Sequence, residues 1–244
     1  MQHRSYLFLL AHPDDEIYAC VLLRRLLLVG KEVIVVYATS GDAGGRGPIR
    51  EQEASRALGV VHLNVAKIFF LRVAERQVCD DLRTVVQKTK QLAIRHQVDC
   101  IISPDYEGGH EGHDAISFAG AQVATGCKTA QYVFPLYHCR DGKRVGARFK
   151  PGREATDTIS LTEQDKSIKE GFLAAHQTQR AHFENLHKAS ADYWSLLFSR
   201  EVFSRVDGKI NFRERPCEEI GYEIHTAQPY RFSEFQKAIS KQIM

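Results

Sequence analysis

Residues 5–38, SYLFLLAHPDDEIYACVLLRRLLLVGKEVIVVYA, carry the pattern that decides the fold. The apolar runs 6–11 and 33–38 predict buried strands at 5–11 and 32–38, and residues 16–29 between them predict a helix that ends at Gly30. Strands that are apolar on both faces are typical of parallel sheets covered by helices on each side. The stretch therefore predicts a βαβ unit at the start of an α/β fold.

The same alternation continues along the chain. We expect strands at 67–71, 99–103 and 130–138, and helices at 50–58, 80–96, 114–125, 162–186 and 189–204. The predicted fold is α/β: a Rossmann-like, doubly wound, mostly parallel sheet with helices on both faces. We expect a single domain over residues 1–244, with the core sheet at about 5–140 and C-terminal helices and short strands at 160–244.

The composition is that of an ordinary globular protein. The 244 residues are 43% hydrophobic and 26% charged, which is enough apolar content for one substantial core. Lysine and arginine nearly balance aspartate and glutamate, leaving a formal net charge of +3. Nothing in the global charge therefore requires nucleic acid or an anionic membrane as a partner.

The sequence favours a cytoplasmic location and predicts no membrane span. No segment reaches the roughly 18 uninterrupted apolar residues of a spanning helix, and the N-terminal run meets acidic residues too early for a secretory signal. The six cysteines are widely scattered without a C-x-x-C pair. We therefore expect reduced core residues rather than a zinc knuckle or a redox couple.

Polar side chains follow two of the predicted strands at the points where these strands end. HPDDE, residues 12–16, follows the first strand, and SPDYEGGHEGHDA, residues 103–115, follows the strand at 99–103. Loops beyond the carboxyl ends of parallel strands form the ligand site of such sheets, so we expect the two clusters to meet. The side chains brought together are His12, Asp14, Asp15, His110 and His113. Imidazole and carboxylate groups are zinc ligands, so zinc is the leading candidate.

Each cluster taken alone has a simpler interpretation. Asp14 or Asp15 can cap a helix N-terminus, with Glu16 favourably placed in the first turn. His110 and His113 lie in a glycine-rich stretch and can simply be solvated. The placement of both clusters at strand ends favours a shared site, and the neighbouring glycines suit a backbone that turns tightly.

These motifs resemble the LmbE/PIG-L family of zinc-dependent N-deacetylases, which remove acetyl groups from amino sugars. AHPDDE after an opening strand and a later G-H-x-x-H are similar to the signature segments of that family. The likeness extends to ATSGDAGG (38–45), IREQEASRALGV (49–60), FPLYH (134–138) and a K…H-x-T-Q pattern within 161–179. It runs through most of the chain, roughly residues 6–203.

The resemblance implies a role for each polar residue of the two loops. His12, Asp15 and His113 would bind Zn²⁺, or another divalent transition metal such as Fe²⁺. Asp14 would act as the general base. A protonated His110 would stabilise the oxyanion that forms when water attacks the acetyl carbonyl.

The second motif departs from the family pattern. The common H-P-D-H is replaced here by His110, Glu111, Gly112 and His113, so the aspartate before the last histidine is missing. The sequence therefore leaves open which carboxylate sets the protonation of His110. The candidates are Glu107, Glu111 and Asp114.

Three further residues are candidates for substrate binding. Arg50 matches the arginine that opens the family's R-x-x-E helix and would contact sugar hydroxyls, although the following Leu-Gly comes about one turn early. Asp42 and Tyr137 are expected near the same edge of the sheet. The basic loop within 140–153 is either a solvated surface or a clamp for a phosphate-bearing substrate.

The sequence thus predicts a metal-dependent N-deacetylase, a hydrolase of linear amide C–N bonds. It would release acetate from an N-acetylated amino sugar, such as an N-acetylglucosamine conjugate. The partner would be this small carbohydrate rather than nucleic acid, and the oligomeric state is open. The alternatives are an amidase acting on a related sugar or thiol conjugate, and an inactive sugar-binding protein on the same fold.

Overall fold

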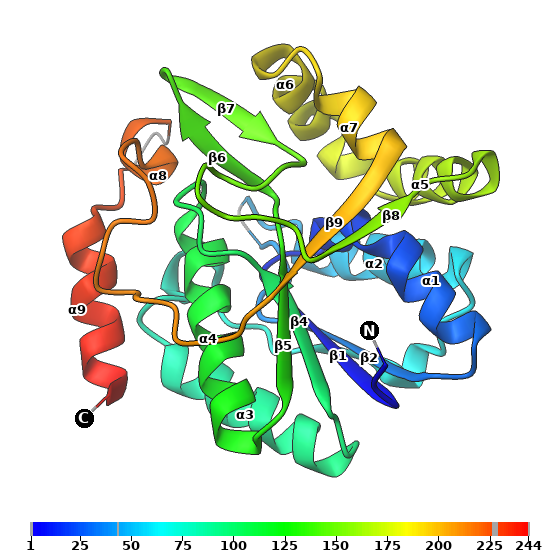
Figure 1. Ribbon diagram of the computed structural model, residues 1–244, viewed down its shortest axis with the longest axis horizontal. Coiled ribbons are helices and arrows are strands. Elements are labelled where there is room, and N and C mark those ends of the chain that lie inside the picture. Colours follow the sequence, from blue (N-terminus) through cyan, green and yellow to red (C-terminus); the bar gives the residue numbers. More distant parts are fainter. Residues whose placement is uncertain (1, 43, 226–228, 244) are drawn as a thin grey trace.

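The computed structural model describes residues 2–42, 44–225 and 229–243, arranged around a seven-stranded sheet (Figure 1). The strand order is β3-β2-β1-β4-β5-β9-β8. The parallel strands are β1 (Ser5–Leu10), β2 (Glu32–Tyr37), β3 (Ile68–Phe70), β4 (Cys100–Pro104) and β5 (Ala130–Phe134). At one edge, β9 (Arg200–Arg205) and β8 (Asp157–Ser160) are antiparallel. The predicted α/β class, with a mostly parallel sheet, is confirmed.

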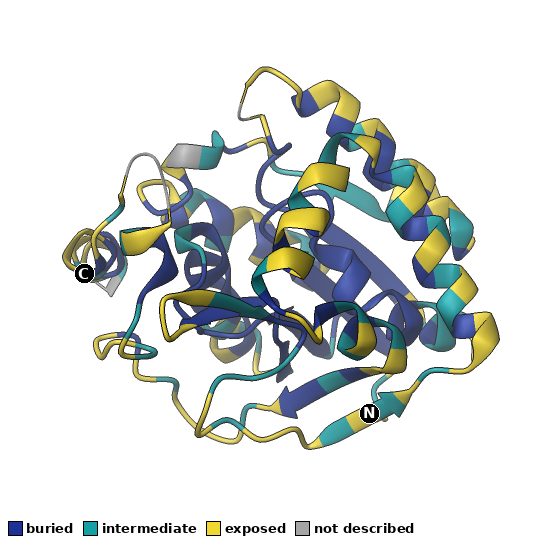
Figure 2. Cartoon of the chain, turned by 90° about the horizontal axis from the view of Figure 1, so that it is seen from above, coloured by how far each residue is buried: buried dark blue, intermediate teal, exposed yellow. Residues whose placement is uncertain are grey.

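Successive residues of β1 pack on opposite faces of the sheet, as the pleat requires. Tyr6 and Phe8 belong to one hydrophobic core, and Leu7 and Leu9 belong to the other. The first core is covered by α1 (Cys20–Leu28), α2 (Gly47–Val60) and α5 (Glu163–Ala175), and the second by α3 (Leu82–Arg95), α4 (Glu111–Cys127) and α9 (Phe232–Ile243). Figure 2 shows the central strands buried between helices whose outward turns are exposed. Burial on both faces explains the uninterrupted apolar runs.

The order in which the chain adds strands to the sheet reverses at β1. From β1 the chain moves outward to β2 and β3, then returns to β4 and β5 on the other side. β1 therefore pairs with both β2 and β4, with Phe8 opposite Val35 and Ile102. The loops that follow β1 and β4 diverge at this point, which is where ligands bind in open α/β sheets. These two loops are the ones that carry the two polar clusters.

The region after β5 differs from the predicted strand at 130–138 and basic loop. β5 ends at Phe134 because Pro135 has no N–H for the ladder. The chain then forms a hairpin of β6 (Tyr137–Arg140) and β7 (Lys143–Gly146), which packs against α6 (Arg180–Ala189). Asp141 and Gly142 at its turn both have positive φ, 52° and 69°. Asp-Gly is the preferred pair for such a turn, so the sequence held a signal for this hairpin.

Three predicted helices also differ from the structure. The predicted 16–29 helix begins as a 3-10 turn, η1 (Asp15–Tyr18), before α1. The predicted 162–186 helix is interrupted at His176 by η4 (Gln177–Gln179). The predicted 189–204 helix is α7 (Tyr193–Ser199) followed directly by β9, because its last five residues, 200–204, belong to a strand that pairs with β5 and β8. The other short elements are η2 (Val65–Lys67), η3 (Glu75–Gln77) and α8 (Gly221–Ile224).

Two general features bear on the environment of the protein. Within the described ranges, no helix has the length and apolar character needed to cross a bilayer. All six cysteines are free thiols, and four of them are buried.

The N-terminus of α5 is joined to α1 by Asp165, and this contact should make stability depend on pH. Asp165 completes a capping box with Thr162 and accepts a hydrogen bond from Arg25 Nη2 at 2.7 Å. Burial raises the pKa of Asp165, but its hydrogen bonds to Arg25 and Thr162 outweigh this effect and lower the pKa overall. The ionised carboxylate therefore stabilises the native state above the unfolded-state pKa of about 4 and loses this effect as the pH falls through the lower folded-state value.

We expect Asp165→Asn to lower the free energy of unfolding by about 1 kcal/mol at pH 7, the usual cost of a lost cap. The difference from the wild type should shrink below about pH 4, where the carboxylate becomes protonated. Urea unfolding of both proteins between pH 7 and pH 3.5 measures this difference in the free energy of unfolding. A difference that stays constant down to the lowest pH would contradict a role for the charge.

Candidate active site

The loop after β1 fixes one oxygen of the Asp15 carboxylate and leaves the other free. Oδ2 accepts the backbone N–H groups of Ala11 and His12, each at 2.9 Å. Oδ1 lies 3.3 Å from His113 Nε2 and 3.9 Å from His12 Nδ1. Burial opposes ionisation of Asp15, but the two histidines outweigh it and hold its pKa well below the ordinary value. An ionised oxygen is thus presented to two imidazole rings.

His12, Asp15 and His113 form a group that could hold one metal ion. Each offers a ligand atom, and these atoms all lie within 4.8 Å of one another. The three residues are at most 6% exposed, and the buried His12 Nε2 has no hydrogen-bond partner. A buried nitrogen in this state calls for a ligand, and two imidazoles with one carboxylate suit zinc. The donor set therefore fits the expected metal.

His12 also belongs to a second group that could hold a metal ion. This group consists of His12, Glu75 and His110, whose ligand atoms also lie within 4.8 Å of one another. Glu75 Oε1 lies 3.7 Å from His12 Nε2. Because both groups use His12, they describe one region of a single site rather than two separate sites.

Asp14 lies next to this group in a conformation that L-residues rarely adopt. Its φ is 130°, and its N–H donates to Glu16 Oε2 at 2.9 Å. Glu16 is held in turn by His176, whose Nε2 lies 2.6 Å from Glu16 Oε1, and neither side chain is exposed. Such backbone strain persists only where the surroundings enforce it, and here a buried carboxylate and histidine do so.

The pKa of Asp14 is set by burial and by neighbouring charges. Burial is the largest effect and raises this pKa; the Arg50 guanidinium lowers it and the Asp15 charge raises it, and the net pKa is about 7. Arg50 Nη2 lies 3.1 Å from Asp14 Oδ1. A carboxylate with a pKa near neutrality is well suited to take and return a proton.

Arg50 makes its hydrogen bonds within the protein. Besides Asp14, Nη2 donates to the Pro13 carbonyl at 2.6 Å, and Nη1 donates to the Gly41 carbonyl at 3.3 Å. A Cβ at Gly41 would lie 2.2 Å from Arg50 Nη1, so only glycine allows the guanidinium to approach. Arg50 lines the pocket, but its donors hold the loop after β1 instead of facing a free space for sugar hydroxyls.

His110 is the N-cap of α4, and this position determines its protonation. Its Nδ1 accepts the Gly112 N–H at 3.0 Å, so that nitrogen carries no proton. Burial and the neighbouring His12 and His113 lower the pKa of His110 well below its ordinary value. This geometry favours a neutral ring with its proton on Nε2 over the expected protonated histidine.

The three carboxylates considered as partners of His110 have different positions. Glu107 accepts the N–H groups of residues 136 and 137 at 2.7 and 2.8 Å. Asp114 accepts the N–H groups of residues 107 and 108 at 3.1 and 3.0 Å. Glu107 and Asp114 therefore stabilise the backbone around the loop that follows β4. Glu111 is the one of the three that lies near His110, with its Oε2 3.5 Å from His110 Nδ1.

The two loops close a pocket of about 230 Å³, which is small for an organic ligand. Seven of the eight predicted site residues line it, namely His12, Asp14, Asp15, Arg50, His110, His113 and Tyr137. The eighth, Asp42, lines a different hollow, and its Oδ1 accepts the Glu75 N–H at 3.1 Å. Asp42 therefore holds the backbone at Glu75 and does not line this pocket.

Further residues that the sequence did not single out as site candidates also line the pocket. They are Tyr18, Glu75, Leu136, Arg144, Gln179, His182 and Phe183. Glu75 follows β3, so the strand-end rule that found the two clusters would also have found it. His182 lies on α6 within an ordinary amphipathic pattern, which gives no sign that this helix reaches the site.

The fold and the site together define an α/β protein with a buried His-Asp-His group between β1 and β4. The first half of the chain is similar to the PIG-L family: residues 7–124 match the family described as "PIG-L: GlcNAc-PI de-N-acetylase". This match includes both polar loops. It ends before Tyr137 and the β6–β7 hairpin.

One known protein is similar in sequence. A probable N-acetylglucosaminyl-phosphatidylinositol de-N-acetylase of Dictyostelium discoideum is 30% identical over 123 residues, which are 47% of each chain. The match thus spans about half the length of that relative.

Two solved structures have the same fold. N,N'-diacetylchitobiose deacetylase from Pyrococcus horikoshii superposes with a TM-score of 0.61 at 14% identity, covering 84% of each chain. The zinc-inhibited form of teicoplanin deacetylase Orf2 has a TM-score of 0.62 at 12% identity, covering 84% of this chain and 100% of that one. At these identities the likeness concerns the fold alone.

Proposed function

We propose that this protein is a zinc-dependent N-deacetylase that hydrolyses the acetamide of an N-acetylated amino sugar or its conjugate. The observation that carries the proposal is the buried group of His12, Asp15 and His113, with the Asp14 carboxylate held beside it. The relatives support the substrate class, because two of them are named for N-acetylated amino sugars. Fe²⁺ is an alternative metal for the same ligands.

The residues of the pocket have complementary roles in this reaction. Zinc, when bound by the three ligands, would act as a Lewis acid that favours ionisation of water and polarises a carbonyl. Asp14 takes a proton from the attacking water and returns it to the leaving amine, so acetate and a free amine are the products. His110 donates from Nε2 to the acetyl oxygen as negative charge develops on it. Arg50 and Glu16 hold Asp14 in place for both proton transfers.

The size of the pocket limits which part of a substrate it encloses. A volume of about 230 Å³ leaves the larger part of any conjugate outside the pocket. Tyr137, whose ring centroid lies 5.3 Å from that of His113, is placed to contact the sugar next to the metal group. We also propose a reducing compartment such as the cytoplasm, because the six cysteines are free thiols.

Acetate release from defined substrates tests the proposal. Protein loaded with one equivalent of zinc is incubated with N-acetylglucosamine, N,N'-diacetylchitobiose and an N-acetylated thiol conjugate. We expect acetate and free amine from at least one sugar, loss of activity on chelation and recovery on adding zinc back. Loading is limited to one equivalent because a protein with this fold has a zinc-inhibited form.

The other outcomes point to the alternatives. Cleavage of the thiol conjugate alone would identify the related amidase. Saturable binding of a sugar with no acetate released by the zinc-loaded protein would identify a binding protein. Either result would overturn the proposed deacetylation of amino sugars.

A further inference from the structure

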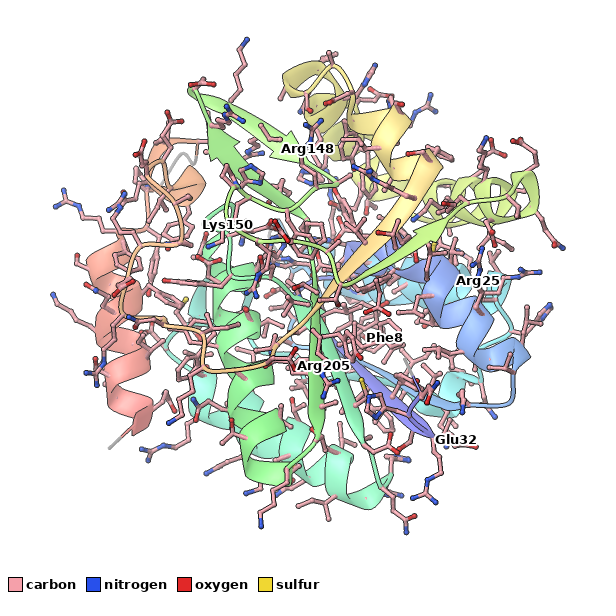
Figure 3. All side chains as sticks on the ribbon, in the orientation of Figure 1. Phe8, Arg25, Glu32, Arg148, Lys150 and Arg205 are labelled. Atoms are coloured by element: carbon pink, nitrogen blue, oxygen red, sulfur yellow. The ribbon has the colours of Figure 1, made fainter. Side chains whose placement is uncertain are left out.

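A second hollow, which we name the basic pocket, lies on the other side of the β6–β7 hairpin. It has a volume of about 500 Å³. Its charged lining residues are Arg140, Asp141, Arg148, Lys150, Arg153 and Asp192. Arg148 and Lys150 lie on the segment that follows β7 (Figure 3). Among the described residues, the basic pocket and the catalytic pocket share no lining residue.

The hairpin separates the two pockets because alternate residues point to opposite faces. Tyr137 and Arg144 line the catalytic pocket, whereas His138, Arg140 and Val145 line the basic pocket. The register agrees with this division, since His138 lies directly opposite Val145. A ligand in the basic pocket would therefore not occupy the catalytic pocket.

The charges around the basic pocket favour an anion. Arg148 pairs with Asp192, and Arg140 pairs with Asp141. Lys150 Nζ donates to the Pro216 carbonyl at 2.7 Å, so its charge faces a neutral partner. Arg153 pairs with a carboxylate outside the lining, that of the fully buried Asp105. Four cationic side chains thus face three carboxylates, which leaves a net positive charge.

Two buried nitrogen atoms in the same pocket lack hydrogen-bond partners. They are Arg148 Nε and His138 Nδ1, and His138 is only 2% exposed. The guanidinium always carries its Nε proton, so this atom is an unsatisfied donor. A neutral imidazole carries its proton on either nitrogen, so Nδ1 can donate as well. Buried donors without partners are rare in native structures, and here both belong to residues that line a positively charged hollow.

We propose that the basic pocket binds a phosphate group, either inorganic phosphate or the phosphate of a small monoester. Phosphate carries nearly two negative charges at pH 7 and several acceptor oxygens, which match the unpaired charge and the two unsatisfied donors. Arg148 and His138 donate to its oxygens, and Lys150 and Arg140 supply the surrounding positive charge. The proposal does not depend on the deacetylase reaction, because the site lies outside the catalytic pocket.

Calorimetric titration of the metal-free protein tests this site without the catalytic metal. Inorganic phosphate and glucose 6-phosphate are titrated at constant ionic strength, with glucose as the control, because screening changes with salt. We expect saturable binding of phosphate or of the monoester and none of glucose. Tighter binding of glucose 6-phosphate would identify a monoester ligand, and equal affinities would identify the phosphate group itself.

Variants locate the bound phosphate. Arg148→Gln and His138→Phe should each weaken binding by about ten-fold or more, which is the usual effect of losing one charge-assisted hydrogen bond. Arg205→Gln is the matched control, because Arg205 also forms a surface pair with an aspartate, Asp207, and lies outside the pocket. Its affinity should change less than about two-fold, as is usual for a distant surface charge. Thermal unfolding without phosphate verifies that each variant is folded.

Two results would overturn the proposal. One is the absence of saturable phosphate binding by the wild-type protein. The other is an unchanged affinity in the folded Arg148→Gln variant, because the phosphate would then bind elsewhere.

Discussion

Replacing Asp14 with asparagine should leave the protein folded and able to bind zinc but lower kcat by about 10²- to 10⁴-fold, the usual contribution of a general base. Asparagine retains an oxygen that can accept from Arg50 Nη2, which lies 3.1 Å from Asp14 Oδ1. It also tolerates positive φ better than most residues, which matters at a φ of 130°. The amide cannot accept a proton at neutral pH. A loss of turnover with unchanged metal content would therefore follow from the lost base.

His113→Ala is the matched variant that separates the two proposed roles. It removes one of three ligands whose donor atoms lie within 4.8 Å, so the purified protein should contain much less zinc. Metal analysis and acetate release are measured on both variants after identical loading. Equal zinc content in the two would contradict the division between a base and a ligand. Full activity in Asp14→Asn would remove Asp14 from the mechanism.

The position of the site could be predicted from the sequence because it depends on topology. Apolar runs separated by helices indicate a parallel sheet, and the ends of parallel strands share one edge. His12 and His113 are about a hundred residues apart, yet their ring centroids lie 5.3 Å apart because β1 pairs with β4. Two local patterns and one topological rule were sufficient to bring these residues together.

The connections that hold the site could not be predicted in the same way. Glu16 has the usual place of an acidic residue in a first helical turn, yet its carboxylate bridges the Asp14 N–H and His176. That bridge depends on α5 ending at His176 beside the β1 loop, which is a matter of tertiary packing. Arg50 is similar, since its contacts with Pro13 and Gly41 require α2 to meet the loops that follow β1 and β2. Residue type gave the chemistry of these side chains but not their partners.

A buried ion pair contacts the segment that follows the loop after β1. Lys169 Nζ lies 2.7 Å from Glu201 Oε1 and donates to the Ile17 carbonyl at 2.5 Å, with both side chains at most 1% exposed. Glu201 also accepts the first N–H groups of α1, from Val21 at 3.0 Å and Leu22 at 2.8 Å. The pair therefore joins α5 and β9 to the segment that follows the catalytic loop.

Lys169→Met should lower the free energy of unfolding by about 3–5 kcal/mol, because it leaves the Glu201 carboxylate buried without its counterion. The double variant Lys169→Met/Glu201→Gln removes both charges and keeps an amide oxygen for the α1 N–H groups, so it should recover much of this loss. Urea unfolding of the wild type, both single variants and the double variant gives the interaction energy. If the two single effects simply add, the unpaired charge is not the cause. Activity measured on the same four proteins tests the connection to the site, since a loss of acetate release in the folded double variant would show that the pair positions the β1 loop.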